Sequence, residues 1–447
     1  MIVNDFIIFF FYYYFILLLY IMSFYSDANV ATRYLDPKIY VPAETGIGRV
    51  TYELDSNEVA YLPNMRLTNI GVTVSAKTEY NIQLGALGQI RNIRLLDGKV
   101  LLSSVERFQF HRGFINVNKP NSVCESVTSQ LECGGLGWTV DGDTGKIRRR
   151  ARTRPADVNS IDNTTTPTDG AWLDLREVFP MLNSVSHLPT EVFNNLRIEI
   201  ELDTRQQSQP LVSVITTQTS IRPLLAVDVL ENPEIVNKLN DSLNGASWLE
   251  VEHDQFVIPQ ATNDGGVADQ LVVQTTSVKL NGFNNKHLER LLLVKAIDPT
   301  KEENAGSVVG LGMYSSQACF EQELQYRING RNLLPAMDTK GNNRRLAQIV
   351  DNYGDCFAYL GSNQYGMTGG TTNEVEAGRN FLGQLDYMGT YVGEYVNDLQ
   401  LIYRRTGLQD ATAKRPTTAQ LTVHAYGETR KVLMVNNNGT YRISYEQ

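Results

Sequence analysis

The sequence predicts an all-β protein built as two tandem sandwiches. A short stretch that reads as strand, tight turn and strand occurs twice, about half the chain apart. A strand of alternating apolar and polar residues appears late in each half. Elsewhere, short β-rich runs are separated by turn residues and long polar loops, with few helical patterns. A single core rarely serves a chain of 447 residues, so we expect two domains.

The repeated stretch contains the same kind of dipeptide in both copies. The first is Asp97-Gly98 and the second is Asn329-Gly330. Such dipeptides between apolar runs favour a hairpin, because a type I′ turn needs positive φ at both central residues. We therefore interpret these four residues as structural turns at equivalent places in a duplicated domain.

The strands that follow the hairpins also recur in order. Leu196–Leu202 alternates apolar and charged residues, and Leu399–Arg404 nearly repeats that pattern. Leu225–Val229 and Leu421–Ala425 then close the two halves. A period of two places alternate side chains on opposite faces, as in a half-buried strand.

A helix and an arm complete the predicted organisation. Apolar residues of Pro233–Gly245 share one helical face, with Pro near the start and Gly after the end, so this segment is a predicted linking helix. The residues before the first strands show little periodicity. The predicted segments are a leader or hydrophobic segment (1–21), an N-terminal arm (22–45), a first sandwich (46–231), a linker helix (232–247) and a second sandwich (248–447).

The first residues are extremely apolar. Phe6–Met22 carries no charge, and an extension to Tyr25 is long enough to span a bilayer. The basic region of a signal peptide is missing. Nearly every residue here has a codon made only of A and T. We interpret Met1–Ile21 as AT-rich leader DNA translated upstream of a start at Met22, with a membrane anchor as the alternative.

Other helices are expected to be short and to lie in loops. Val105–Val117 is compatible with a short helix, and Arg344–Asn352 with another. Asp174 and Glu177 have the spacing of a capping box for a helix that Pro180 interrupts.

Charge is unevenly distributed along the chain. The net charge of −9 argues against wholesale wrapping by nucleic acid, but one run is densely basic. Its cations repel one another and require solvent, acidic partners or phosphate, so we predict a loop. The run comprises Lys146, Arg148, Arg149, Arg150, Arg152 and Arg154.

No motif for catalysis, cofactor binding or metal binding is recognisable. Phosphate-binding, nucleophile-elbow and zinc-protease patterns are absent from the sequence, and four cysteines are too few for a disulfide framework. Glu250 and His253 should point to opposite faces of a strand, as exposed sheet residues. His424 is likewise expected to point outward. We therefore predict no catalytic residues, no cofactor and no metal site. Paired acids for glycoside chemistry stay open, since such pairs are spatial and not sequential.

Three segments give the sequence a family resemblance. They are Ile90–Ser104, Leu173–Leu182 leading into Leu196–Leu202, and Arg327–Pro335. Together they resemble the double jelly-roll major capsid proteins of the adenovirus-hexon and tectivirus lineage, nearest to polinton-like viruses and virophages. The resemblance covers roughly Ser23–Gln447. The hydrophobic leader departs from the family pattern.

The resemblance implies a fold and a structural role without catalysis. The fold would be two tandem eight-stranded jelly rolls. Three copies would form a pseudo-hexameric tile of an icosahedral shell around double-stranded DNA, assembled inside the host cell. Expected partners are further copies of the chain, minor capsid or penton proteins, and packaged DNA. The basic run would face the genome or a neighbouring subunit. The alternative is a secreted or membrane-anchored tandem β-sandwich that binds carbohydrate or hydrolyses glycosides.

Overall fold

The structure of the chain is a computed structural model. It describes residues 30–41, 47–54, 60–70, 72–74, 87, 90–118, 137–140, 147–150, 171–203, 215–218, 223–232, 236, 243, 245–258, 271–297, 321–333, 348, 351–352, 387–408, 421–436 and 439–445.

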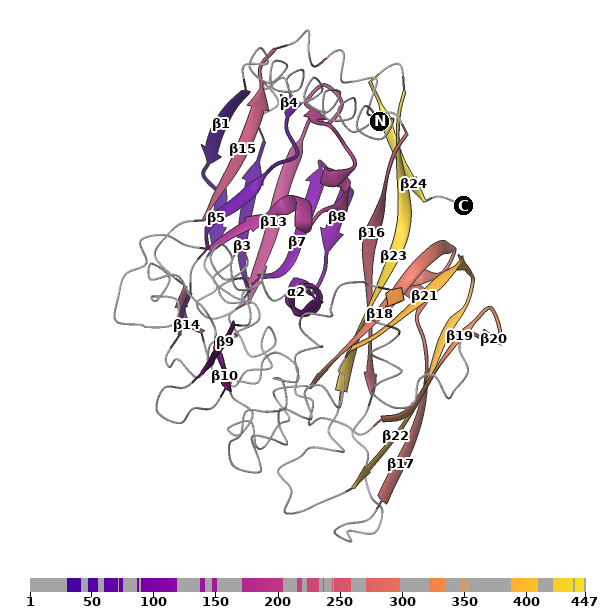
Figure 1. Cartoon of the computed structure of the whole chain (residues 1–447). Coiled ribbons are helices and arrows are strands. Elements are labelled where there is room, and N and C mark those ends of the chain that lie inside the picture. The colour runs from indigo at the N-terminus through magenta and orange to yellow at the C-terminus, as the bar shows by residue number, and fades with distance from the viewer. Residues whose placement is uncertain are drawn as a thin grey trace, which may run out of the picture.

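The first half of the chain forms two large sheets (Figure 1). One has the order β11-β5-β15-β4-β12, with β1 paired to β15, and the other has the order β2-β3-β13-β7-β8. Two short ribbons, β9 with β10 and β6 with β14, are separate from them. The elements are β1 (Val30–Leu35), β2 (Ile39–Val41), β3 (Ile47–Glu53), β4 (Ala60–Tyr61), β5 (Arg66–Ile70), β6 (Val72–Val74), β7 (Ile90–Asp97), β8 (Val100–Val105), α2 (Phe108–Asn118), β9 (Gly137–Val140), β10 (Ile147–Arg150), β11 (Ala171–Asp174), the 3-10 turns η5 (Leu175–Glu177) and η6 (Pro180–Asn183), β12 (Leu188–Pro189), β13 (Leu196–Asp203), β14 (Ile215–Gln218) and β15 (Leu224–Leu230).

The second half forms another pair of sheets. One has the order β16-β23-β18-β21, with β24 paired to β23, and the other has the order β17-β22-β19-β20. The elements are β16 (Ala246–Ile258), β17 (Leu271–Lys279), the 3-10 turn η8 (Asn281–Phe283), β18 (Lys286–Ile297), β19 (Glu321–Ile328), β20 (Arg331–Asn332), β21 (Tyr387–Val396), β22 (Leu399–Leu408), β23 (Leu421–Val435) and β24 (Tyr441–Tyr445).

Both halves share one topology. Eight strands of the first half (β1, β3, β5, β7, β8, β11, β13 and β15) correspond in order to β16 through β23. In each set the first, eighth, third and sixth strands form one sheet, and the second, seventh, fourth and fifth form the other. This order is that of a jelly roll, a sandwich of two Greek keys. The predicted pair of eight-stranded jelly rolls is confirmed, with β2, β4, β12 and β24 as additional paired strands.

Equivalent backbone hydrogen bonds support the duplication. The amide of Leu54, directly after β3, donates to the carbonyl of Leu196 at 3.0 Å. In the second sandwich the amide of Leu280, directly after β17, donates to the carbonyl of Leu399 at 2.9 Å. Both bonds join the end of the second strand to the start of the seventh, so the recurring late strands occupy the same place in each jelly roll.

Each sandwich has an apolar core, and the first core extends into the second half of the chain. Ile198 and Ile200 are buried in the first core because the alternation in β13 directs them inward. Leu291 and Leu401 lie in the second core. Trp248, near the start of β16, is buried with the first core. The two sandwiches therefore share packed apolar surface along the upper part of β16 (Figure 1).

The prediction of an N-terminal arm at residues 22–45 is wrong for the part that the structure describes, because residues 30–35 and 39–41 are strands. Val30–Leu35 forms β1, which pairs along its whole length with Leu225–Leu230. Ile39–Val41 forms β2 on the edge of β3. Residues 30–35 are a strand because their backbone is hydrogen-bonded to β15, the closing strand of the first sandwich. That partner is distant in sequence, so the local periodicity does not reveal the pairing. The first sandwich thus includes residues that precede its predicted boundary at residue 46.

The short helices agree with expectation where they are described. Phe108–Asn118 forms α2. Asp174 accepts a hydrogen bond from the amide of Arg176 at the start of η5, and Pro180 opens η6. Most of the predicted linker helix and of Arg344–Asn352 lies outside the described residues, as do residues 1–21. No helix among the described residues is long and apolar enough to cross a membrane.

Candidate functional site

The contact between the two sandwiches carries buried polar and aromatic groups from both of them. Strand β8, the turn after it and α2 come from the first sandwich. Strands β16 and β23 come from the second, and β16 runs beside β8 (Figure 1). In β16, residues three apart point to opposite faces. One face of this strand carries a carboxylate site and the other carries an imidazole cluster.

The carboxylate site is centred on Glu250, whose side chain is buried. Its oxygens accept hydrogen bonds from the indole Nε1 of Trp248 at 2.7 Å and from the amide of Ser104 at 2.8 Å. The hydroxyl of Ser103 lies 3.0 Å from Oε2. Burial raises the pKa of Glu250, while the charge of Lys431 and these hydrogen bonds act in the opposite direction. The carboxylate therefore joins β16 directly to β8.

The imidazole cluster lies on the opposite face of β16. His253 Nε2 is 3.1 Å from His424 Nδ1, and the ring of His424 stacks on Phe110 with centres 4.3 Å apart. Tyr426 lies with its ring centre 5.1 Å from those of His111 and His253. Helix α2 of the first sandwich is thus packed against β23 of the second by aromatic contacts, and His253 of β16 lies beside the two β23 rings.

The structure corrects three expectations about these residues. Glu250 and His253 do point to opposite faces of a strand, as predicted. They are not exposed sheet residues, however, because Glu250 is hydrogen-bonded to β8 and His253 lies against His424, on which Phe110 of α2 stacks. His424 is 3% exposed and does not point outward. The sequence feature that could have indicated this site is Trp248 and Glu250 on one face of a strand, because a tryptophan next to a carboxylate can be buried as a hydrogen-bonded pair. The strands that contact them, β8 and β23, cannot be identified from the local sequence.

The predicted structural turns lie at equivalent places, between the fourth and fifth strands of each jelly roll. Asn329 and Gly330 have φ values of 50° and 83°, as the type I′ turn requires. The first turn differs, because Asp97 pairs with Val100 and the loop is shifted by one residue onto Gly98. Asp97 lies at the end of its strand instead of in the loop, which corrects the prediction for that residue.

Both turn side chains bind the segment before the seventh strand. Asp97 Oδ1 accepts from the amide of Asn195 at 2.8 Å. Asn329 Oδ1 accepts from the amide of Asn397, also at 2.8 Å. The Asp and Asn at these places therefore have the same structural role in the two sandwiches, despite the shift of the loop.

Part of the predicted basic loop is a strand. Residues 147–150 form β10, which pairs antiparallel with β9, so that Arg149 lies opposite Trp138 and Arg150 opposite Gly137. Backbone pairing with a strand ten residues earlier explains the difference from the predicted loop. Lys146, Arg152 and Arg154 lie outside the described residues.

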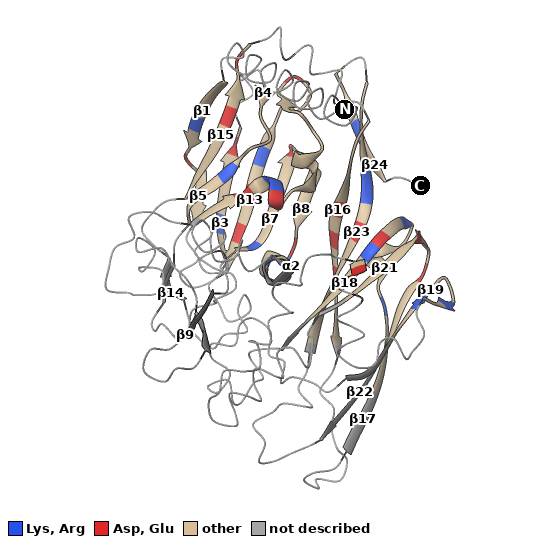
Figure 2. Ribbon diagram, viewed as in Figure 1, with Lys and Arg blue, Asp and Glu red and all other residues tan. Residues whose placement is uncertain are grey.

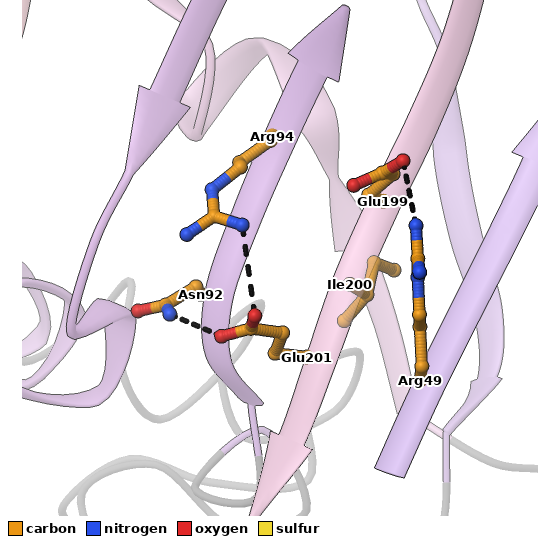
Figure 3. Close-up of a pocket in the computed structure, with 6 residues that line it drawn as sticks. All are labelled: Arg49, Asn92, Arg94, Glu199, Ile200 and Glu201. Carbon is orange, nitrogen blue, oxygen red and sulfur yellow. Dashed lines mark hydrogen bonds and ion pairs between the residues drawn. The ribbon is translucent and has the colours of Figure 1, made fainter. Parts of the chain in front are cut away.

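A hollow of about 160 Å³ lies on the outer face of β3, β13 and β7 (Figure 3). Its charged groups are paired with one another: Arg49 Nη2 is 2.9 Å from Glu199 Oε1, and Arg94 Nη1 is 3.6 Å from Glu201 Oε1. Figure 2 likewise shows acidic and basic residues interspersed along the strands. Because its charges are internally compensated, we assign this hollow no ligand. The described residues contain no cluster of His, Cys, Asp or Glu suited to a metal ion.

Comparison with known proteins identifies the fold. No protein-family model and no curated protein matches the sequence. Solved structures do match. A chain of the PBCV-1 virus capsid aligns with a TM-score of 0.53 at 11% identity, over 94% of this chain and 98% of that one. The mavirus major capsid protein aligns with a TM-score of 0.53 at 9% identity, over 93% and 90%. The Faustovirus major capsid protein aligns with a TM-score of 0.50 at 7% identity, over 91% and 90%.

These alignments extend over both sandwiches and over nearly the full length of the matched chains. The chain therefore has the double jelly-roll fold of these structures. Identities of this size establish the fold, and function has to be argued separately.

Proposed function

We propose that this chain is the major capsid protein of a double-stranded DNA virus and has a structural role instead of a catalytic one. The observation that carries the proposal is the presence of two jelly rolls in one chain, aligned over 94% of its length with a chain of a viral capsid. A sandwich that assembles by its edges and faces needs no reactive group. Its place in the virus would be the virion capsid.

The proposed assembly is a homotrimer with a pseudo-hexagonal outline. Three chains contribute six jelly rolls, and a closed ring requires two different contacting surfaces on each copy. Obligate contacts of this kind bury more than roughly 2,000 Å². Further copies would extend the shell, and minor capsid or penton proteins would complete it. For the two sandwiches we propose bounds of about Val30–Glu231 and Ala246–Gln447.

The contacts between copies are proposed to involve polar segments outside the jelly rolls. The candidates are residues 23–29 and the segments 146–170, which includes β10, and 361–378. Deletion of the whole stretch 23–48 is an unsuitable test, because it removes β1 and its pairing with β15. Deletion of residues 23–29 leaves β1 intact and should weaken assembly beyond the trimer while leaving the trimer itself unchanged.

The basic run is proposed to face packaged DNA or a neighbouring subunit. Phosphates neutralise clustered cations and release counterions, which supports the first of these partners. Reversal of charge at Arg149, Arg150 and Arg152 should lower the DNA content of particles or impair their assembly. A matched control reverses Lys99, Arg331 and Arg442, which changes the net charge equally. DNA-filled particles from the first variant would indicate a solvated ribbon with neither role.

The alternative function, a secreted or membrane-anchored protein that binds or hydrolyses carbohydrate, is not supported by the matched structures, which are capsid proteins. Electron microscopy of the expressed chain tests the proposal against it. We expect particles with a hexagonal outline and six lobes. A monomer that hydrolyses a glycan would contradict the proposal.

A further inference from the structure

Three of the five histidines of the chain meet at the contact between the sandwiches. His111 comes from α2, His253 from β16 and His424 from β23. His253 and His424 are directly hydrogen-bonded, and Tyr426 bridges His253 and His111 by ring contacts. Three elements that are distant in sequence thus bring their imidazoles into one cluster.

The hydrogen bond between the two rings restricts their protonation. A bond of 3.1 Å between His253 Nε2 and His424 Nδ1 needs one nitrogen to donate and the other to accept. A neutral imidazole has one nitrogen of each kind, whereas both nitrogens of an imidazolium are donors. If both rings were protonated, two donors would face each other and the hydrogen bond would be lost.

The charged groups that act on the rings are cations. Arg107, in the turn before α2, acts on His253 and His424, and Arg112 of α2 acts on His111. Among the described residues, the other electrostatic effects on these rings come from the imidazoles themselves. A proton added to the cluster therefore meets repulsion.

The acidic groups on the neighbouring elements are engaged elsewhere. On β16 itself, Glu252 pairs with Lys286, and Asp254 accepts from the amide of Gly282 at 3.0 Å. Glu177 of η5 lies 2.6 Å from Arg112, and Glu428 of β23 accepts a hydrogen bond from Arg290 of β18 at 2.6 Å. The guanidinium of Arg112 is itself nearly fully buried, with 2% exposure. These carboxylates are thus engaged in ion pairs or hydrogen bonds instead of compensating a charged imidazole.

We propose that the cluster of His111, His253 and His424 is an acid-sensitive latch between the two sandwiches. Neutral rings hold α2 against β23, with His253 of β16 supporting His424, and proton uptake by the rings loosens this contact. In the shell, a role that rests on the proposed function, the latch would weaken the tile in an acidic compartment and favour release of the contents.

The direction of the pH effect follows from the environment of the rings. Burial, with added repulsion from nearby positive charge, lowers the pKa of His111 and of His253 to about 4, and that of His424 well below its ordinary value of 6.5. The open state thus binds more protons than the closed state between about pH 6.5 and pH 4. The contact is fully stable above this window and loses stability as the pH falls through it.

Buried carboxylates have the opposite effect. Burial raises the pKa of Glu250 and of Glu428. In the acid range these groups bind protons more readily in the folded chain than in the unfolded one, so their titration favours the folded state as the pH falls. A loss of the sandwich contact in acid would therefore not come from these two residues.

Hydrogen exchange on the full-length protein tests the latch without requiring assembly. Amide exchange would be followed in α2 and β16, with β13 as the internal reference, at pH 7.5 and pH 5.0, after correction for the intrinsic rate at each pH. We expect opening of α2 and β16 to rise at least tenfold more than that of β13, since His111 and His253 each contribute roughly thirtyfold at pH 5 and the lowered pKa of His424 acts in the same direction. An equal change of the exchange rate in α2, β16 and β13 would overturn the latch.

Variants assign the effect to the rings. Glutamine is uncharged and can both donate and accept, so the triple variant His111→Gln, His253→Gln and His424→Gln should lose most of the excess opening in acid. His287→Gln, a histidine of β18 outside the cluster, should keep it. An undiminished excess in the triple variant would contradict the proposal.

The wild-type pH profile decides the matter if the triple variant does not fold. Between pH 6.5 and pH 4.5, the decimal logarithm of the opening constant should rise by at least one for each unit by which the pH falls, which corresponds to the uptake of at least one proton on opening. A smaller slope contradicts the latch. Hydrogen exchange measures opening within one chain, whereas the capsid proposal is tested by assembly. The failure of one proposal is therefore distinguishable from the failure of the other.

Discussion

The phenol of Tyr441 donates a hydrogen bond to Oδ2 of Asp97 at 2.8 Å, across the contact between the two sandwiches. The other oxygen of Asp97 accepts from the amide of Asn195 within the first sandwich. The carboxylate of Asp97 thus binds both the backbone of Asn195 in the first jelly roll and the side chain of Tyr441 in the last strand of the second. Asp97 and the imidazole cluster thus both join the sandwiches, one through a hydrogen bond and the other through aromatic contacts.

Tyr441→Phe should destabilise the sandwich contact by about 1 kcal/mol, because it removes a hydrogen bond to a largely buried carboxylate and keeps the ring. Urea unfolding followed by tryptophan fluorescence measures the change. Tyr34→Phe is the matched control, since the Tyr34 side chain is 58% exposed. An equal effect of both substitutions would argue against a specific role of the bond to Asp97.

Glu250→Ala should destabilise the protein by roughly 2–4 kcal/mol, since it leaves the Trp248 indole and the Ser104 amide without their acceptor. Glu250→Gln retains an acceptor oxygen and should cost only about 1 kcal/mol. Glu231→Gln, at an exposed ion pair with Arg33, should change stability by less than about 0.5 kcal/mol. A Glu250→Ala variant as stable as Glu231→Gln would refute the assigned role.

Gly330→Ala should destabilise the second hairpin by about 1 kcal/mol, because the φ of 83° is unfavourable for alanine. No heavy atom lies within 4 Å of the added Cβ, so the effect should come from the backbone alone. Gly330→Asn should lose less, since Asn tolerates this conformation. If thermal unfolding showed the same loss of stability for Gly330→Asn as for Gly330→Ala, the positive φ would not be the cause of the loss.

Gly427→Ala should be more damaging for a steric reason. The added Cβ would lie 2.5 Å from Phe283 and 2.7 Å from Leu288, both buried in the second core. Overpacking of this kind costs about 1–3 kcal/mol. Phe283→Leu, combined with Gly427→Ala, should restore part of the loss. No rescue in the thermal midpoint of the double variant would exclude the predicted clash.

Local sequence was sufficient for the features that depend on local physics. Asn329-Gly330 has the backbone angles that its turn type demands, and β13 follows from strict alternation in Leu196–Leu202. The order of the late strands was also predictable, because the same patterns recur in both halves. These features rest on neighbouring residues and on a period of two.

Long-range pairing was not predictable in the same way. Val30–Leu35 becomes a strand because Leu225–Leu230 pairs with it, almost 200 residues later in the chain. Glu250 and His424 look like outward residues of a half-exposed sheet until the first sandwich covers them. Burial of a polar residue at a contact between domains is decided by both domains, and no local pattern records it.

The solution mass of the purified full-length protein at neutral pH tests the capsid assignment most directly. Light scattering coupled to size-exclusion chromatography should give three times the chain mass of 50.2 kDa at micromolar concentration. A trimer persists on dilution because an obligate ring buries a large surface. A stable monomer over the same concentration range would contradict the proposed tile.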